Sequence, residues 1–180
     1  MVAGIESIAS KDDDFYAYLD ETNVEGCLEA LDDLETYIMK EGPFDGVMAF
    51  SAGAGFIASL MIRRRRQNPT REHLNPLFKC AIFFSGGVPG ELSVDGSKIG
   101  LLSFDTDGEL IEIPTAHIWG ANDQLYPTFG PVLSKLCKKE TRAVFIHDGG
   151  HELPASEDKQ AVGKSLEVIG TTIERAQSAQ

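Results

Sequence analysis

Hydrophobic residues along the chain gather into short continuous runs and into longer periodic stretches. Four runs have the length and apolar character of buried strands, at residues 46–50 (GVMAF), 80–86 (CAIFFSG), 115–120 (TAHIWG) and 142–147 (RAVFIH). Around them, periodic or small-residue stretches predict helices over 24–41, 52–66, 130–139 and 157–176. Because apolar strands that alternate with helices are typical of parallel sheets, the sequence predicts an α/β protein with a three-layer α/β/α sandwich.

The helix before the first predicted strand has clear boundaries. Thr22 or Asn23 can cap its N-terminus, and the pair Gly42-Pro43 ends it. Its apolar positions follow helical spacing at Val24, Leu28, Leu31, Leu34 and Ile38. Its acidic residues are expected to form a solvated surface rather than a metal site.

The remaining segments are less regular. Residues 1–21 alternate acidic and aromatic residues and are expected to form a loop-like lead segment. Residues 101–113 predict either a hairpin or an irregular excursion. Arg63 to Arg66 lie near the end of the second predicted helix, where cations complement the helix dipole, and this role is favoured over an anion-binding patch. We interpret residues 1–180 as one domain.

Composition narrows the class of protein. The chain has 180 residues, a formal net charge of -12 and 42% hydrophobic residues, which fits a globular domain and argues against a nucleic-acid partner. We expect no membrane interaction and a cytoplasmic protein, because no secretory signal or membrane-spanning run is visible. Three cysteines, Cys27, Cys80 and Cys137, have no metal-binding spacing and are expected to be reduced and packed.

Residues of hydrolytic chemistry follow three of the predicted strands. Ser51 comes directly after DGVMAF, Asp123 lies in WGANDQLYP, and His151 lies in HDGGHELP. In parallel sheets, ligands bind beyond the carboxyl ends of the strands. A serine, a histidine that removes its proton and a carboxylate that orients the histidine form a nucleophilic triad, and the order Ser, Asp, His is that of α/β-hydrolases. The sequence therefore predicts a catalytic triad at this edge.

Small residues surround Ser51. A sharp strand-to-helix turn crowds the backbone, so the residues two before and two after the serine, Ala49 and Gly53, are expected to be small for that reason. The usual pattern is Gly-x-Ser-x-Gly, from which Ala49 departs.

The other histidines and nearby aspartates are expected to have different roles. His147 ends a strand and is expected to support the site, His117 is expected to be packed within a strand, and His73 lies in a polar loop. Asp148 could compete with Asp123, but it is close to His151 in sequence instead of approaching it from another strand end. Asp45 precedes its strand and so lies at the opposite end of the sheet.

Three blocks together carry a family resemblance: GPFDGVMAFSAGAG, IPTAHIWGANDQLYP and HDGGHELP. From about residue 22 to 176 the chain resembles the fungal serine hydrolase family, an α/β-hydrolase group of small esterases and polyketide-releasing thioesterases. The segment FFSGGVPG is similar to the family's strand ending in Ser-Gly, which faces the same pocket.

The resemblance implies roles for individual residues. Ser51 would be the nucleophile, Asp123 the orienting acid and His151 the base, and the backbone N–H of Ala52 would bind the oxyanion. The substrate would be a small-molecule acyl ester or thioester, in polyketide metabolism also one bound to a carrier protein, and no metal or organic cofactor is implied. Candidates for the substrate pocket, or for the core instead, are Phe50, Phe84, Leu125 and Tyr126.

The chain departs from the family at its front. Members usually begin with a strand and a His-Gly turn that gives a second oxyanion donor, and residues 1–21 contain no such pattern, so we expect an N-terminally shortened sheet. Val47 to Phe50 would then form an uncovered apolar edge. The alternatives are a truncated gene product, self-association through that edge, or a degenerate homologue; the last would be a catalytically impaired interaction or ligand-binding domain.

Overall fold

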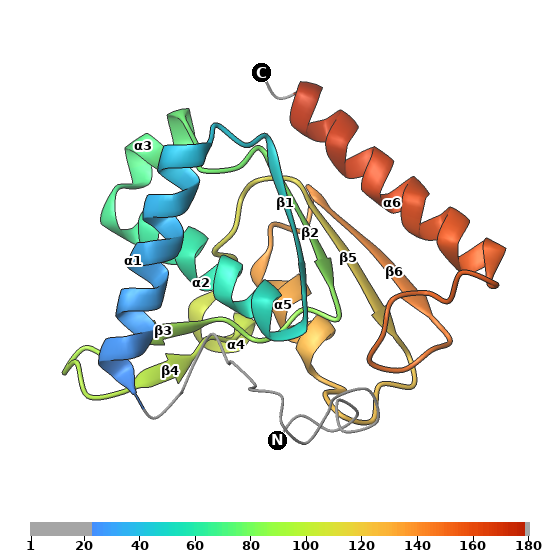
Figure 1. Cartoon of the computed structure of the whole chain (residues 1–180), viewed down its shortest axis with the longest axis horizontal. Coiled ribbons are helices and arrows are strands. Elements are labelled where there is room, and N and C mark those ends of the chain that lie inside the picture. The colour runs from blue at the N-terminus through green and yellow to red at the C-terminus, as the bar shows by residue number, and fades with distance from the viewer. Residues whose placement is uncertain (1–22, 179–180) are drawn as a thin grey trace, which may run out of the picture.

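The computed structural model describes residues 23–178, which form a parallel sheet with helices on both faces (Figure 1). The sheet has four strands in the order β1-β2-β5-β6: β1 (Gly46–Phe50), β2 (Cys80–Phe84), β5 (Thr115–Gly120) and β6 (Arg142–His147). A separate antiparallel hairpin joins β3 (Gly90–Leu92) to β4 (Ile99–Leu101). The helices are α1 (Val24–Glu41), α2 (Ser51–Gln67), α3 (Pro69–Leu74), α4 (Phe104–Asp107), α5 (Phe129–Leu136) and α6 (Lys159–Ser178). These elements confirm the predicted α/β sandwich.

Local sequence explains how the first helix and strand are arranged. The Asn23 side chain accepts a hydrogen bond from the Gly26 amide at 3.0 Å and so caps α1. β1 pairs with β2 in parallel over its whole length, from Gly46 opposite Cys80 to Phe50 opposite Phe84. The chain passes from β1 into α2 without a loop, because Phe50 ends the strand and Ser51 begins the helix.

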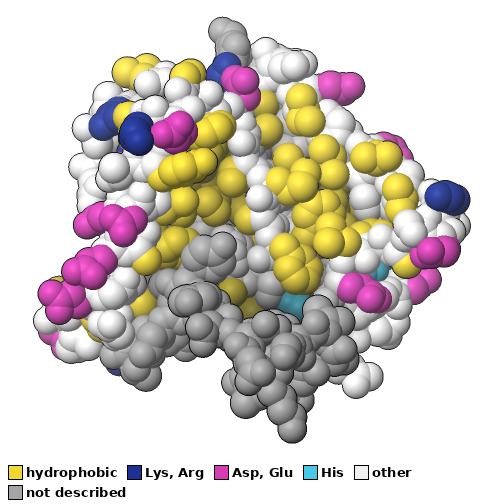
Figure 2. All heavy atoms as spheres, in the orientation of Figure 1, with side chains coloured by type: hydrophobic (Ala, Val, Ile, Leu, Met, Phe, Trp, Pro, Cys, Tyr) yellow, Lys and Arg dark blue, Asp and Glu magenta, His cyan; other side chains and the backbone are white. Residues whose placement is uncertain are grey.

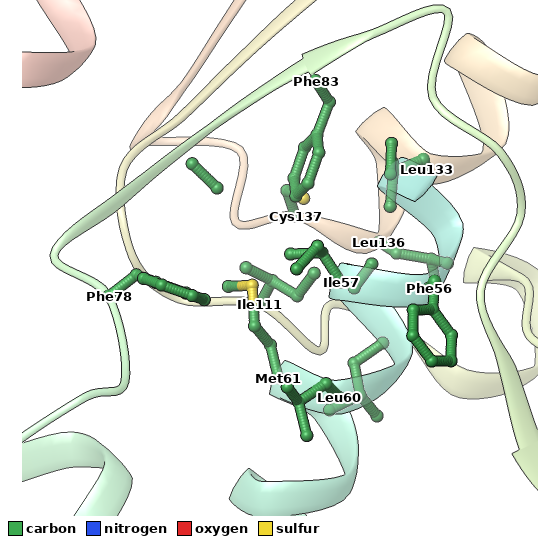
Figure 3. Close-up of a cluster of buried hydrophobic side chains, with 14 of the residues drawn as sticks. Phe56, Ile57, Leu60, Met61, Phe78, Phe83, Ile111, Leu133, Leu136 and Cys137 are labelled. Atoms are coloured by element: carbon green, nitrogen blue, oxygen red, sulfur yellow. The ribbon is translucent and has the colours of Figure 1, made fainter. Parts of the chain in front are cut away.

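Two hydrophobic clusters hold the helices to the sheet. The larger one lies between the sheet and α1, α2 and α5, and it includes Ile57 and Leu60 of α2, Leu133 of α5 and Phe83 of β2 (Figure 3). The smaller one joins β2, β5 and β6 to α6 on the other face. Helices thus pack on both faces of the sheet, and because all its strands are parallel, their carboxyl ends lie together along one side.

The four consecutive arginines of α2 pair with carboxylates of neighbouring elements. Arg63 contacts Asp32 and Glu35 of α1, and Arg64 contacts Glu35 and also Glu72 of α3. Arg65 and Arg66 pair with Glu112 and Glu91. The arginines therefore tie α2 to its neighbours.

The structure decides between the two alternatives for residues 101–113. The hairpin lies earlier, with its strands at 90–92 and 99–101, while residues 104–107 form the short helix α4. The Asp107 carboxylate accepts a hydrogen bond from the Ser103 amide at 3.0 Å, which favours a helical turn there. The segment is an irregular excursion, and α3 is a further helix that the pattern did not predict.

Strand β1 lies at the edge of the sheet. Among residues 23–178 it pairs only with β2, and its side chains Met48 and Phe50 are 61% and 39% exposed. Figure 2 shows hydrophobic side chains gathered on this face over β1 and beside it. The expectations for residues 1–21 lie outside the described residues.

Helices long and apolar enough to cross a bilayer are absent from the described part of the chain.

Candidate active site

Ser51 stands at the turn from β1 into α2 in a strained backbone conformation. Its φ angle is 51°, in the left-handed region that non-glycine residues rarely adopt. Such strain is found at functional sites, where surrounding contacts maintain it. The turn directs the serine beyond the carboxyl end of the sheet, as a nucleophile elbow does.

Close backbone approaches near this elbow involve α2 and the turn after β2. A Cβ atom at Gly53 would meet nothing within 4 Å among the described residues outside its chain neighbours and the nearby backbone of α2. A Cβ at Gly87 would lie 2.8 Å from the Ser51 carbonyl oxygen, and one at Gly55 would lie 3.0 Å from the Val88 carbonyl oxygen.

Hydrogen bonds join the three predicted triad side chains. The Nε2 atom of His151 lies 2.7 Å from the Oγ atom of Ser51, and its Nδ1 atom lies 2.6 Å from the Oδ2 atom of Asp123. With Nδ1–H donating to the carboxylate, Nε2 is left as the acceptor for the serine hydroxyl. The arrangement can therefore pass a proton from Ser51 to His151.

The loops that carry Asp123 and His151 are bound to each other. The Ala121 amide donates to the His147 carbonyl at 2.7 Å, and the Asn122 amide donates to the Gly149 carbonyl at 3.0 Å. Gly120 packs so closely against the second loop that a Cβ there would lie 2.2 Å from the Gly149 carbonyl oxygen. These contacts hold the carboxylate and the imidazole within reach of each other.

The environment of Asp123 favours its ionised form. Burial raises the pKa of this carboxyl, but hydrogen bonds from the Tyr126 amide, from His151 and from the Leu125 amide outweigh burial. The two amides donate to Oδ1 at 2.8 and 3.1 Å, which leaves Oδ2 for the histidine. The pKa of Asp123 consequently lies below its ordinary value.

Aromatic side chains surround the His151 ring. The rings of Phe50 and Tyr126 have their centroids 5.1 and 4.9 Å from it. Phe129, which the sequence analysis missed, stacks on Tyr126 at 4.4 Å and presents its edge to the same histidine. The sequence feature that could have indicated Phe129 is its position: it is the aromatic first residue of the helix that follows the Asp123 loop.

The other candidates for the pocket lie in different surroundings. Leu125 is largely exposed on the Asp123 loop, whereas Phe84 is buried in the cluster under α6 and belongs to the core. Ala52 is the second residue of α2, where backbone N–H groups have no acceptor within the helix. That position adjoins Ser51 at the positive end of the helix dipole.

The remaining histidines and aspartates have structural partners. His117 is buried and contacts Thr115 at 3.0 Å, and burial followed by the charge of Arg142 lowers its pKa to about 3. His147 is buried and accepts a hydrogen bond from the Gly149 amide at 3.1 Å. Asp45 pairs with Lys79 at 2.8 Å.

One further residue and a search for metal ligands complete the description of the site. Ser85, at the end of β2, has a φ angle of 43° and a buried hydroxyl with no hydrogen-bond partner among residues 23–178. Within the same described range, no group of three or more His, Cys, Asp or Glu side chains could hold a metal ion.

Sequence comparison identifies the family. The family described as "Serine hydrolase (FSH1)" matches residues 4–162, so the chain belongs to this serine hydrolase family. The match begins within the segment 1–21, which the sequence analysis had left outside the resemblance.

Individual relatives are named as esterases or hydrolases. The chain is 37% identical over 153 residues to Esterase FPY3 of Fusarium mangiferae, covering 84% of this chain and 66% of that protein. It is 33% identical over 136 residues to Hydrolase phiM of a fungal species, strain ATCC 74256, covering 76% and 62%. The matched region thus spans less than two thirds of the length of these relatives.

A solved structure shows the same fold. The monoacylglycerol lipase of Paleococcus ferrophilus superposes with a TM-score of 0.52 at 14% sequence identity, covering 84% of this chain and 77% of the lipase. This likeness establishes the α/β-hydrolase fold of the chain.

Proposed function

We propose that the chain is a serine hydrolase that cleaves an ester or thioester of a small-molecule acyl substrate. The observation that carries this proposal is the continuous hydrogen-bonded series Ser51, His151, Asp123, with distances of 2.7 and 2.6 Å at the ends of three parallel strands. Membership of the serine hydrolase family supports the same reaction class.

In the first half of the reaction, His151 Nε2 takes the hydroxyl proton of Ser51 as Oγ attacks the substrate carbonyl carbon. The carbonyl oxygen becomes an oxyanion, which the Ala52 N–H is placed to bind next to the nucleophile. When the bond to the leaving group breaks, the proton on His151 passes to the departing oxygen or sulfur, and an acyl-Ser51 ester remains.

Water completes the cycle. His151 takes a proton from the water molecule, the resulting oxygen nucleophile attacks the acyl carbon, and Ser51 regains its proton as the acid leaves. Throughout, ionised Asp123 stabilises the protonated imidazole and holds the tautomer that leaves Nε2 free to accept. Its lowered pKa suits this role because the carboxylate stays charged at neutral pH.

The aromatic side chains beside the His151 ring suit an apolar leaving group. Phe50 and Tyr126 contact the imidazole and are both partly exposed, and Leu125 lies beside them. Together they form an apolar surface next to the atom that protonates the leaving group. An alkyl or aryl alcohol or thiol would be desolvated there.

Hydrolysis of p-nitrophenyl acetate tests the proposal. We expect turnover by the native chain, and loss of about 10⁴-fold or more in kcat on Ser51→Ala or His151→Ala while the fold is retained. Circular dichroism and thermal melts verify folding of each variant. Equal hydrolysis by native chain and Ser51→Ala would contradict it.

A second candidate comes from a different class. It is a binding domain that keeps the fold but lacks turnover. The same assay separates the two: a folded native chain without esterase activity supports the binding domain.

A further inference from the structure

A groove begins beside the nucleophile elbow and continues along α2. It has a volume of about 530 Å³ and lies between α1, α2 and the β3–β4 hairpin, which are found together on the left of Figure 1. Its near end is formed by Ala52, Gly87 and Phe129. Ala52 follows Ser51 directly, Gly87 is hydrogen-bonded to the Ser51 carbonyl, and Phe129 lies beside the His151 ring, so the groove begins next to the backbone of the elbow and to the imidazole.

The groove is long in one direction. Its floor follows one face of α2 from Ala52 to Arg66, which at 1.5 Å per helical residue corresponds to about 21 Å. The Ser59 hydroxyl accepts a hydrogen bond from the Gly90 amide at 2.9 Å and fixes the hairpin against the helix in the middle of this length. This hydrogen bond between the hairpin and α2 therefore helps to fix the width of the groove.

The walls of the groove are apolar. Leu28 and Leu31 of α1 face Val88 after β2, and the hairpin adds Leu92, Ile99 and Leu101. Leu101 is 70% exposed and Leu92 37% exposed, so apolar side chains remain in contact with solvent along the groove. Covering this surface with an apolar ligand would be favourable, by about fourfold in affinity for each methylene removed from water.

The far end carries no free charge. Arg66 is paired there with Glu91 and, at 3.5 Å, with Asp107, and Arg63 pairs with Asp32 and Glu35. Because each of these guanidinium groups already has a carboxylate partner, the described residues that line the groove offer no unpaired cation to an anionic group. A neutral chain fits its charge as well as its shape.

From these features we infer that the groove along α2 binds the acyl part of the substrate, and that this acyl group is an extended, uncharged, apolar chain. The inference rests on the proposed function for the position of the acyl carbon at Ser51. To that function it adds the class of acyl group. An acetyl group would fill only the end of the groove beside Ala52, whereas a long chain would fill its whole length.

A series of p-nitrophenyl esters tests the inference. With acetate, butyrate and octanoate as acyl groups, kcat/KM of the native chain should rise with chain length. Leu28→Trp and Leu101→Trp place an indole in the groove from opposite walls. Each should lower the ratio of octanoate to acetate kcat/KM by about tenfold or more, because the displaced methylenes lose their contacts.

Val94→Trp is the matched control. Val94 lies on the same hairpin, is fully exposed and does not line the groove. This variant adds the same indole to the same element and should hydrolyse all three esters as the native chain does. If Leu28→Trp and Leu101→Trp also keep the native ratio of octanoate to acetate activity, the inference is wrong.

Binding provides a readout that needs no catalysis. The fluorescent fatty acid cis-parinaric acid should bind the Ser51→Ala variant, and adding Leu28→Trp or Leu101→Trp should weaken its binding by about tenfold. Binding that depends on the groove residues, without any acetate hydrolysis, would support the groove and refute the hydrolase. Acetate hydrolysis without chain-length preference or groove-dependent binding would refute the groove alone, and absence of both activities would refute both.

Discussion

The backbone amide of Gly87 donates a hydrogen bond to the carbonyl oxygen of Ser51 at 2.8 Å, so the turn after β2 is bound to the β1–α2 turn that carries Ser51. The turn reaches this position through Ser85, whose φ angle of 43° redirects the chain. A side chain at Gly87 would collide with the backbone of Ser51 and Ala52. The glycine thus supports both the serine and the neighbouring N–H.

Gly87→Ala should therefore impair catalysis more than stability. A Cβ 2.8 Å from the Ser51 carbonyl oxygen forces a backbone shift at the elbow, and a displacement of about 1 Å at a reacting group can cost about 10²-fold in rate. We expect kcat to fall by that order with little change in KM, measured with p-nitrophenyl acetate.

Gly86→Ala is the control for this variant. Its Cβ would meet the Leu133 side chain at 2.6 Å instead of the elbow backbone, so overpacking should cost about 1–3 kcal/mol of stability. kcat of the folded protein should remain native. Equal loss of kcat in both variants, compared at a temperature where both are folded, would show that Gly87 has only a packing role.

The lowered pKa of Asp123 makes the stability of the fold depend on pH. Its pKa is lower in the folded protein than the ordinary value of about 3.9 expected for the unfolded chain. Ionised Asp123 therefore stabilises the fold fully above the unfolded value, and this contribution is lost as pH falls through the folded pKa. The difference in unfolding free energy between the native chain and Asp123→Asn should be largest at neutral pH and shrink below about pH 4.

Urea unfolding at neutral pH and at several acidic values measures this difference. A difference that stays constant as pH falls would contradict the lowered pKa. In the esterase assay the same variant should lose about 10⁴-fold in kcat, because the asparagine favours the wrong tautomer of His151.

Arg64 makes a testable contribution to the attachment of α1 and α3 to α2. Its side chain is only 6% exposed and pairs with Glu35 and Glu72. Removing it leaves the largely buried Glu72 without its cation, while Glu35 keeps its pair with Arg63. Arg64→Ala should therefore lower the free energy of unfolding by about 3 kcal/mol. Arg66→Ala serves as control, because Arg66 is 43% exposed and its pairs are worth less than about 1 kcal/mol. Urea unfolding that gives equal losses for the two variants would be inconsistent with this account.

Among residues 23–178 β1 pairs with β2 alone, and its other edge predicts self-association. Unpaired strand edges with apolar side chains tend to pair with other chains, and charged residues on the edge prevent this. Size-exclusion chromatography with light scattering should show species larger than a monomer, and Met48→Lys should shift them toward the monomer. Since the chain carries a net charge of -12, added salt should strengthen association of the native chain. A native monomer at all concentrations and salt levels would refute it.

Much of the fold was predictable because its signals are local. Each strand of the sheet is a continuous apolar run, and the capping of α1 by Asn23 is a matter of neighbouring residues. The hairpin was misplaced because β3 and β4 have three residues each, too few for a periodic pattern. Helix α3, with six residues, carried equally little signal.

For the site, the meeting of the three triad side chains was predictable from the sequence, but their surroundings were not. Residues at the ends of parallel strands must lie at one edge, so the proximity of Ser51, Asp123 and His151 followed from their order along the chain. The support from Gly87 could not be predicted, because it depends on how closely the turn after β2 approaches α2. The groove was equally hidden, since its walls come from α1, the hairpin and Phe129, which are far apart in sequence.

Covalent labelling tests the central proposal most directly. A fluorophosphonate probe reacts with a serine only when a neighbouring base and an oxyanion site activate the hydroxyl. Peptide mapping by mass spectrometry should place one phosphonyl group on Ser51 of the native chain, and none on folded Ser51→Ala. A folded native chain that remains unlabelled at Ser51 would contradict the assignment of Ser51 as an activated nucleophile.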